Sequence, residues 1–249
     1  MRQQTCAIDL PGKALYDKEF SVQIRKITPI EQKYILSMSQ KEQKTNRDYI
    51  EFLKGLVIFD NPQMRFEDLF WYDVQYILYK IRFITYEKYP IKLAFTCRNV
   101  LDDGEQCGER IEQELKMGEL DILTPDDLPT LTKEVELENL GPTKIRCKIM
   151  QDDVTIEEFM KARKISSDDY QMRLLLLDLA LISTEHPLEE LYMMASDGTI
   201  TAQDIVTIEE WFKNNIWGVK QVVKVKCPKC GKETLREYAL GLEDFFSAV

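Results

Sequence analysis

The feature that most constrains the fold of this chain is a pair of cysteines near its end, in the segment 227–231 (CPKCG). Two cysteines three positions apart, followed directly by glycine, form the turn with which many proteins hold a tetrahedral zinc ion. The ion needs two further ligands, and residues 187–249 contain no histidine and no other cysteine. A metal site here therefore requires a distant part of the chain to fold back onto this turn.

Cys97 and Cys107 are the candidates for the two missing ligands. Residues 91–97 (IKLAFTC) alternate apolar and polar side chains and predict a strand, and residues 107–117 (CGERIEQELKM) predict a return strand. Both cysteine pairs would then lie at the tips of strand–turn–strand units, as in a zinc ribbon. We predict a closed, structural zinc site whose ligands are Cys97, Cys107, Cys227 and Cys230.

A redox-active pair is the alternative for Cys227 and Cys230. A thioredoxin-like pair opens a helix, whereas residues 235–240 (LREYAL), which follow this pair, resemble a strand. Cys6 and Cys147 lie outside any ligand spacing, and we expect both to be buried as small hydrophobic residues.

The expected compartment supports metal binding over disulfides. No apolar run approaches the roughly 18–20 residues needed to cross a bilayer, and residues 1–13 lack the apolar core of a secretory signal. We therefore expect the chain to stay in a reducing cytosol and to bind no membrane. Paired cysteines there bind metal or do redox work.

The sequence contains few of the residue patterns that catalysis requires. The chain has a single histidine, His186, so a Ser-His-Asp triad or a multi-histidine metal centre would depend on that residue alone. It precedes a proline at the start of a predicted helix, where we expect a capping or surface role. No phosphate-binding or nucleophile-elbow pattern is present. We predict that the protein is not an enzyme and has no small-molecule substrate.

Charge is distributed unevenly along the 249 residues, whose net charge is −10. Residues 98–215 carry 27 Asp and Glu against 12 Lys and Arg, whereas residues 1–97 have a net charge of +3 and residues 216–249 of +2. The acidic block is either a solvated surface or a face that docks a basic partner or keeps nucleic acid away. Both interpretations stay open at this point.

Apolar periodicity predicts mixed α and β structure. We expect a hairpin over residues 133–150 and helices over 28–42, 46–58, 66–85, 155–165, 168–183, 187–195 and 202–215. The predicted fold is therefore α+β, with a four-cysteine zinc-ribbon-like β unit split by an acidic, largely helical insertion. The corresponding regions are the helical N-terminal region leading into the first ribbon strand (1–97), the second ribbon strand plus acidic insertion (98–215), and the second half of the ribbon with the terminal segment (216–249).

The terminal segment ends in two adjacent aromatic residues, Phe245 and Phe246. Leaving them in water costs roughly 25 cal/mol per Å² of apolar area, so we expect them to be buried. One interpretation is that they fold back onto the N-terminal helices. The other is that they form, with Leu242 and Asp244, an apolar patch that docks a partner.

Two segments resemble the T4-type bacteriophage baseplate hub assembly protein family. They are residues 66–97, a helix with an acidic, aromatic start and a basic centre that leads through a strand into a cysteine, and residues 223–246, with the late Cys-x-x-Cys and the terminal Leu-x-Asp-Phe-Phe. The resemblance covers residues 60–115 and 216–249 well. It implies a late viral protein that acts in the host cytoplasm and binds baseplate hub proteins during assembly of the central hub of a contractile tail. It supplies no enzymatic residues.

A zinc-ribbon nucleic-acid-binding protein is the alternative function. Five lysines surround the predicted ribbon: Lys220, Lys224, Lys226, Lys229 and Lys232. The net charge of the chain opposes this function, and Trp217 and Tyr238 are the only obvious aromatic residues near the ribbon on which bases could stack. We therefore expect no nucleic acid among the partners.

Overall fold

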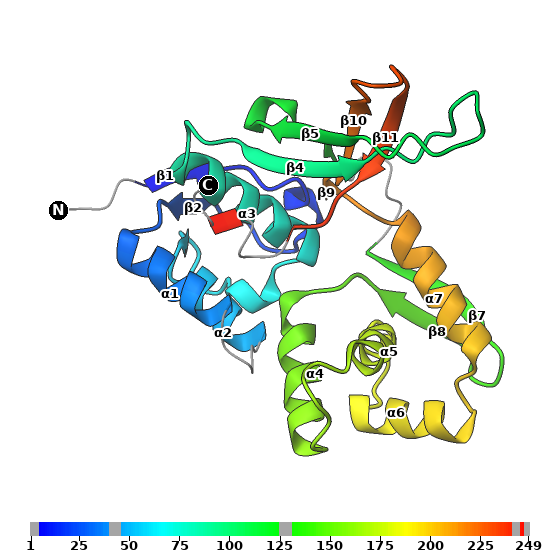
Figure 1. Ribbon diagram of the computed structural model, residues 1–249. Helices are drawn as coiled ribbons and strands as arrows, with labels where there is room; N and C mark the ends of the chain where they lie inside the picture. The colour runs from blue at the N-terminus through cyan, green and yellow to red at the C-terminus, as the bar shows by residue number, and fades with distance from the viewer. Residues whose placement is uncertain (1–4, 40–45, 125–130, 241–244, 247–249) are drawn as a thin grey trace.

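The computed structural model describes residues 5–39, 46–124, 131–240 and 245–246, and it has the α+β character that the sequence predicts. Figure 1 shows a first part, in which helix α3 lies at the centre, and a second part formed by the acidic insertion. Two hairpins, β4–β5 and β10–β11, project together from the first part (Figure 1).

The elements that precede the insertion are β1 (Thr5–Ile8), a 3-10 turn (Lys13–Leu15), β2 (Val22–Arg25), α1 (Pro29–Ser39), α2 (Asn46–Lys54), β3 (Val57–Phe59), a 3-10 turn (Phe66–Asp68), α3 (Trp71–Thr85), β4 (Ile91–Thr96), β5 (Arg110–Leu115), a 3-10 turn (Met117–Glu119) and β6 (Ile122–Leu123). The insertion contains β7 (Thr132–Leu137), β8 (Gly141–Arg146), α4 (Met150–Ala162), α5 (Tyr170–Ala180), α6 (Leu188–Asp197) and α7 (Ala202–Asn214). The chain then returns through β9 (Gly218–Val219), β10 (Val222–Lys226) and β11 (Glu233–Glu237).

Helix α3 organises the core of the first part. Leu69 and Phe70 precede the helix, and its residues Ile77, Tyr79 and Ile81 are fully buried. Strands β1, β2 and β3 form an antiparallel sheet in the order β1-β2-β3, and β2 packs against α3. The core therefore surrounds most of this helix.

A buried carboxylate ties the N-terminal segment to α3. Asp73 is completely buried, and its two oxygens accept hydrogen bonds from the Gly12 backbone N–H (2.8 Å) and the Tyr16 hydroxyl (2.7 Å). A Cβ atom at position 12 would lie 2.5 Å from Asp73 Oδ2 and 2.6 Å from Trp217 Nε1, so only glycine fits there. Burial raises the pKa of Asp73 to about 6.

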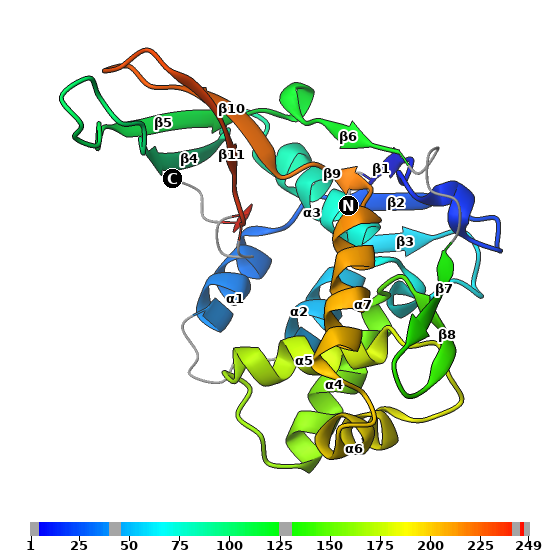
Figure 2. The same ribbon diagram turned by 90° about the vertical axis from the view of Figure 1, so that its right-hand side faces the viewer.

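The acidic insertion has apolar clusters of its own. Its hairpin β7–β8 packs against helices α5, α6 and α7 through Leu137, Ile145, Leu179 and Ile208, and α4 contributes a further cluster around Phe159. Figure 2 shows the four helices gathered on one side of the molecule. Strands β6 and β9 pair antiparallel, so the insertion leaves and rejoins the first part at one place.

Several predicted boundaries differ from the observed ones. The helix predicted over 46–58 ends at Lys54, because residues 57–59 pair with β2 as strand β3. The helix predicted from 66 begins at Trp71 after a 3-10 turn. The helix predicted from 155 begins at Met150, because the Asp152 carboxylate accepts a hydrogen bond from the Ile149 backbone N–H at its start.

The predicted starts of the first and last helices are confirmed. Thr28 and Glu31 form a reciprocal capping box at the start of α1, and Thr201 and Asp204 form another at α7. Gly198 ends α6 in the left-handed conformation, with φ of 85°. Among the described residues, no helix combines the length and apolar character that a membrane span requires.

Candidate metal centre

Two antiparallel hairpins bring the four predicted cysteines together. In the first hairpin, Thr96 at the end of β4 pairs with Arg110 at the start of β5. Cys97 directly follows β4, and Cys107 lies shortly before β5. In the second, Lys226 pairs with Glu233, and Cys227 and Cys230 lie in the turn. Because β10 also contacts β5, the tips of the two hairpins face each other.

Each hairpin tip has a glycine directly after its second cysteine. Gly108 and Gly231 have φ values of 66° and 71°, a conformation that glycine adopts without strain. In one tip the Gly231 N–H donates to the Cys227 carbonyl (2.9 Å), and in the other the Gly108 N–H donates to the Cys97 carbonyl (3.1 Å). In both tips, therefore, the glycine after the second cysteine donates back to the carbonyl group of the first cysteine, although the cysteine spacings differ.

The longer spacing of the first pair is absorbed by a small extension of its hairpin. Val100 and Gln106 form an isolated antiparallel bridge, and the Leu101 N–H donates to the Glu105 carbonyl (2.8 Å) across the turn beyond it. The Cys107 N–H also donates to the Asn99 carbonyl (2.8 Å), so the chain closes again at the cysteines.

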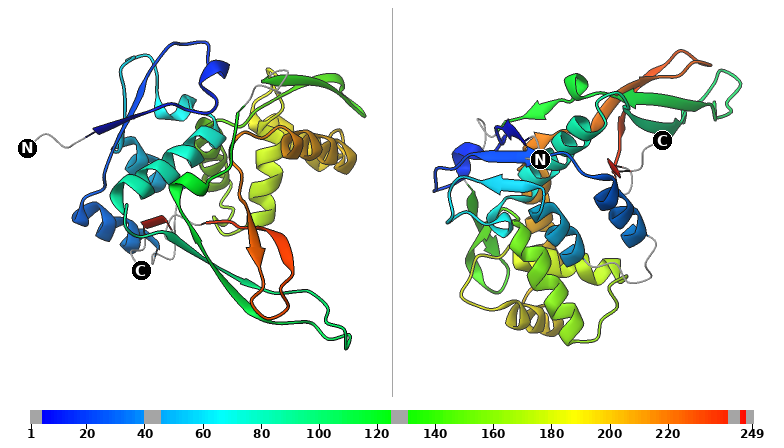
Figure 3. Two further views of the ribbon diagram at one scale, coloured as in Figure 1. Left: turned by 90° about the horizontal axis from the view of Figure 1, so that it is seen from above. Right: turned by 90° about the vertical axis from the view of Figure 1, so that its left-hand side faces the viewer.

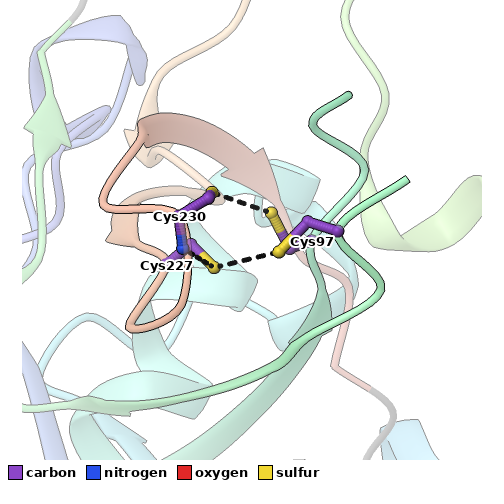
Figure 4. Close-up of side chains that lie close together, drawn as sticks. Cys97, Cys227 and Cys230 are labelled. Atoms are coloured by element: carbon purple, nitrogen blue, oxygen red, sulfur yellow. Dashed lines mark hydrogen bonds between the residues drawn. The ribbon is translucent and has the colours of Figure 1, made fainter. Parts of the chain in front are cut away.

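The four sulfur atoms lie within 4.8 Å of one another. Sγ of Cys97 is 3.7 Å from Sγ of Cys230, and Sγ of Cys107 is 3.7 Å from Sγ of Cys227. Figure 4 shows Cys97 facing Cys227 and Cys230 from the opposite hairpin. Sulfurs at the corners of a tetrahedron with 2.3 Å metal bonds are about 3.8 Å apart, so these four side chains can hold a metal ion.

These distances also exclude disulfides between the two pairs. A disulfide requires its two sulfurs to be about 2.05 Å apart, and all four cysteines are free thiols. Cys97, Cys107 and Cys227 are buried together with Ile111 and Val225 in a cluster of their own. The cysteine side chains therefore make up most of the ribbon's small core.

Backbone N–H donors favour the thiolate form at two of the cysteines, Cys107 and Cys230. The backbone N–H of Lys232 lowers the pKa of the Cys230 thiol to about 6. Near Cys107 the backbone N–H of Glu109 favours the thiolate, but burial and the neighbouring thiols raise its pKa to about 11. A bound cation would make neighbouring thiolates compatible, because its positive charge offsets their mutual repulsion.

Sequence reasoning missed Asn99 as part of this site. Its side-chain amide donates to Sγ of Cys97 (3.3 Å) and contacts Sγ of Cys230 (3.7 Å), so it joins the two hairpins. The Cys-Gly pair at 107–108, which repeats the one at 230–231, is the signal that could have matched the two tips.

The other predicted site residues lie elsewhere. Phe245 and Phe246 are 4% and 0% exposed in the core of the first part, where Phe246 packs on Phe52 of α2 and Phe245 on Tyr79 of α3. The two rings therefore lie where the first interpretation places them, against the N-terminal helices. Leu242 and Asp244 lie outside the described residues, and a partner-binding role for this segment stays a prediction.

The remaining sulfur and imidazole groups take no part in the centre. Cys147 is buried as expected and accepts a hydrogen bond from the Asn215 side chain (3.2 Å). Cys6 is exposed, so its predicted burial is wrong, because it lies on the outermost strand of the three-stranded sheet. His186 is exposed and pairs with Glu190 of α6.

The fold and the site define an α+β protein with a four-cysteine ribbon. Comparison with known families adds that the family described as T4 bacteriophage base plate protein matches residues 1–247. The chain belongs to this family, which confirms the resemblance to T4-type baseplate proteins and assigns the protein a role in the phage baseplate. No curated protein and no solved structure matches the chain.

Proposed function

We propose that the protein is a non-enzymatic, chaperone-like assembly factor for the central hub of a contractile phage tail baseplate. The observation that carries this proposal is that the base plate family spans residues 1–247, which include both the cysteine ribbon and the acidic insertion. The resemblance of residues 66–97 and 223–246 to hub assembly proteins narrows the role from the baseplate to its hub. Such a factor acts late in infection, in the host cytoplasm, and binds hub proteins there.

The buried acids of the described residues support a non-enzymatic role. Asp73 is enclosed completely and accepts hydrogen bonds from the N-terminal segment. Asp178 in α5 is almost fully buried, and burial together with nearby Glu209 raises its pKa to about 7. Asp73 is held by two hydrogen bonds and Asp178 is enclosed in α5, so both contribute to the packing of the fold.

We also propose that the ion held by the four cysteines is zinc and that it is structural. Four thiolate ligands suit zinc, and they leave no open coordination position for a substrate or water. The ion would cross-link two hairpins that share only a small apolar cluster. Its place in the proposed function is to keep the ribbon folded as a surface for assembly.

The nucleic-acid alternative loses support at the ribbon. Lys224 pairs with Glu233 (2.5 Å), and Lys220 with Asp121 (3.6 Å). Lys229 and Lys232 donate to backbone carbonyl groups of the first hairpin tip. Trp217 and Tyr238 are 2% and 8% exposed, so neither ring is available for stacking with bases.

A reconstitution experiment tests the assembly role. Purified hub proteins are mixed with the protein at substoichiometric and equimolar ratios, and hub formation is followed by sedimentation. The expected result is that substoichiometric protein increases the yield of assembled hub and is not retained in it. An equimolar requirement with retention in the hub would instead identify a structural component of the baseplate, and no effect on hub yield would overturn the proposal.

A further inference from the structure

An open groove of about 880 Å³ lies between strand β1 and helix α3. Residues 5–9 form one wall, Tyr76, Lys80, Phe83 and Ile84 of α3 form another, and Lys116 lies just after β5. Figure 3 shows β1, at the blue end of the chain, beside α3. The groove is on the first part of the molecule and is separate from the four cysteines.

One wall of the groove is β1, an edge strand of the three-stranded sheet. Strand β1 pairs with β2 along one side, from Thr5 opposite Arg25 to Ile8 opposite Val22, and no described strand pairs with its other side. Thr5, Cys6 and Ala7 are exposed. An unpaired edge offers a row of backbone N–H and C=O groups to which an extended peptide can add as a further strand.

Four lysines surround this edge: Lys26, Lys80, Lys88 and Lys116. None of the four forms an ion pair with a described residue, which is also true of most other described lysines; Lys54, Lys148 and Lys224 are among those that do form one. The groove also contains two carboxylates, Asp9 and Glu87. Four lysines against two carboxylates give this groove a net positive charge in a chain of net charge −10, and this local charge favours an acidic ligand.

We propose that this groove binds an extended, acidic segment of a partner protein, which adds to the free edge of β1 while its carboxylates meet the four lysines. Side chains of the segment that point inward would contact the apolar surface of Phe83, Ile84 and Pro90. That the partner is a baseplate hub protein rests on the function proposed above. The recognition chemistry rests on the groove alone.

The same lysines could attract nucleic acid, but the rest of the groove fits a peptide better. A sheet edge supplies alternating donors and acceptors at the spacing of an extended polypeptide, which a phosphate backbone cannot use. Asp9 and Glu87 would repel a phosphate backbone, whereas a peptide can place uncharged residues opposite them. We therefore assign the groove to a polypeptide.

Cys6 offers a direct test, because its exposed thiol lines the groove. Short labelled peptides tiled over the baseplate hub proteins, together with a set of extended acidic peptides of unrelated sequence, are screened by fluorescence anisotropy against the metal-loaded protein, before and after alkylation with a bulky maleimide. At least one acidic peptide should bind, and alkylation should abolish its binding. The Cys6→Ser variant, treated in the same way, should keep binding because it has no thiol at this position.

Charge reversal supplies an independent measurement. The double variant Lys80→Glu/Lys116→Glu should bind the same peptide about tenfold more weakly or worse, since two attractions become repulsions. The matched control is Lys133→Glu/Lys161→Glu, which changes the net charge equally on exposed positions of the insertion. It should leave the affinity within about twofold, and circular dichroism verifies that both variants are folded.

The outcomes separate this inference from the proposed function. If no peptide binds, or if binding survives alkylation of Cys6, the inference is wrong even where intact hub proteins are captured. If hub proteins are not captured but an acidic peptide binds and alkylation abolishes its binding, the groove is confirmed as a peptide site. The assignment of the partner as a hub protein is then wrong. Binding of a single-stranded oligonucleotide in place of any peptide, or dimerisation that alkylation prevents, would each overturn the assignment to a partner peptide.

Discussion

The ribbon and the acidic insertion are held together by different forces. The insertion buries leucine and isoleucine side chains in a contiguous cluster, including Leu137, Ile145 and Leu179 at 1% exposure or less. The ribbon buries little besides its cysteines, Ile111 and Val225. Two hairpins with so small a core are marginal in water, so an ion that cross-linked their tips would supply the stability that apolar burial does not.

This difference explains why the high content of Asp and Glu does not prevent the insertion from forming a stable core. Its carboxylates lie mostly outside an ordinary apolar core, and two of the buried ones form ion pairs, Asp153 with Lys148 (2.9 Å) and Asp152 with Arg146 (2.6 Å). The acidic composition is therefore a property of the insertion's surface, whereas the stability of the ribbon is expected to depend on its four cysteines. The two regions should respond to different perturbations.

The largest effect is expected from removing one thiolate. Cys227→Ser should lower the metal content from about one ion per chain to none, because three thiolates bind zinc far more weakly than four. Amide protection should be lost in β4, β5, β10 and β11 and kept in α4–α7. Elemental analysis and hydrogen exchange by mass spectrometry measure the two quantities.

The matched controls are the cysteines outside the centre. Cys6→Ser and Cys147→Ser should both retain the metal, although Cys147→Ser disturbs a buried hydrogen bond. Freshly purified protein that contains no zinc, with no chelator used, would contradict the proposed ion.

The second effect concerns the two buried aromatic residues near the C-terminus, Phe245 and Phe246, which pack in the core of the first part. Phe246→Ala removes a fully buried ring that packs on α2 and should cost about 4 kcal/mol of unfolding free energy, with the metal retained. Chemical denaturation measures it, and Tyr170→Ala, at a ring site that is 65% exposed, should cost little. Equal costs at the two positions would mean that the C-terminal rings are not part of the core.

The third effect tests the apolar core of the insertion. Leu179→Ala should lower the unfolding free energy by about 3 kcal/mol and leave the zinc content unchanged, because Leu179 is completely buried far from the cysteines. Leu235→Ala on the ribbon, where the side chain is 70% exposed, should change it by about 0.5 kcal/mol or less. Loss of metal from Leu179→Ala would show that the two regions are not independent.

The smallest effect is a pH dependence in the insertion. The folded-state pKa of Asp178 is raised to about 7 from 3.8, so its favourable contribution is complete below about pH 4 and is lost as the pH rises through 7. Asp178→Asn should therefore be more stable than the original chain at pH 8, by about 1 kcal/mol after allowance for solvent screening.

Urea titrations at pH 5 and pH 8 measure this difference. The exposed Asp168→Asn serves as the control and should show the same pH dependence as the original chain. If Asp178→Asn raised the unfolding free energy no more at pH 8 than at pH 5, ionisation of Asp178 would not destabilise the folded state.

The cysteine site was predictable from sequence because spacing and strand periodicity are both local signals. The Cys227–Cys230 turn specifies two ligands, and alternation over 91–97 and 107–117 places Cys97 and Cys107 at a hairpin tip. Asn99 was not predictable, because its contacts with sulfur arise only when the two hairpins face each other.

The short strands of the first part were missed for a related reason. β1, β2 and β3 have three or four residues each, too few to show a period, and their pairing joins Thr5 with Arg25 across an irregular segment. The break before α3 was missed because tertiary contacts produce it. The Phe70 backbone N–H donates to the Tyr16 hydroxyl (3.0 Å), and Phe70 bridges to Ile149, while apolar periodicity continues through this position.

The pairing of β6 with β9 has a consequence for how the molecule folds. The contact between Cys97 and Cys230 joins residues 133 positions apart, and closing so long a loop has a high entropic cost. The insertion is rich in local helix contacts, which form fast, and its two ends meet where Ile122 pairs with Val219. Once it has folded, the effective loop that the ribbon must close is much shorter. We therefore expect the insertion to fold first and the cysteines to capture their ion last.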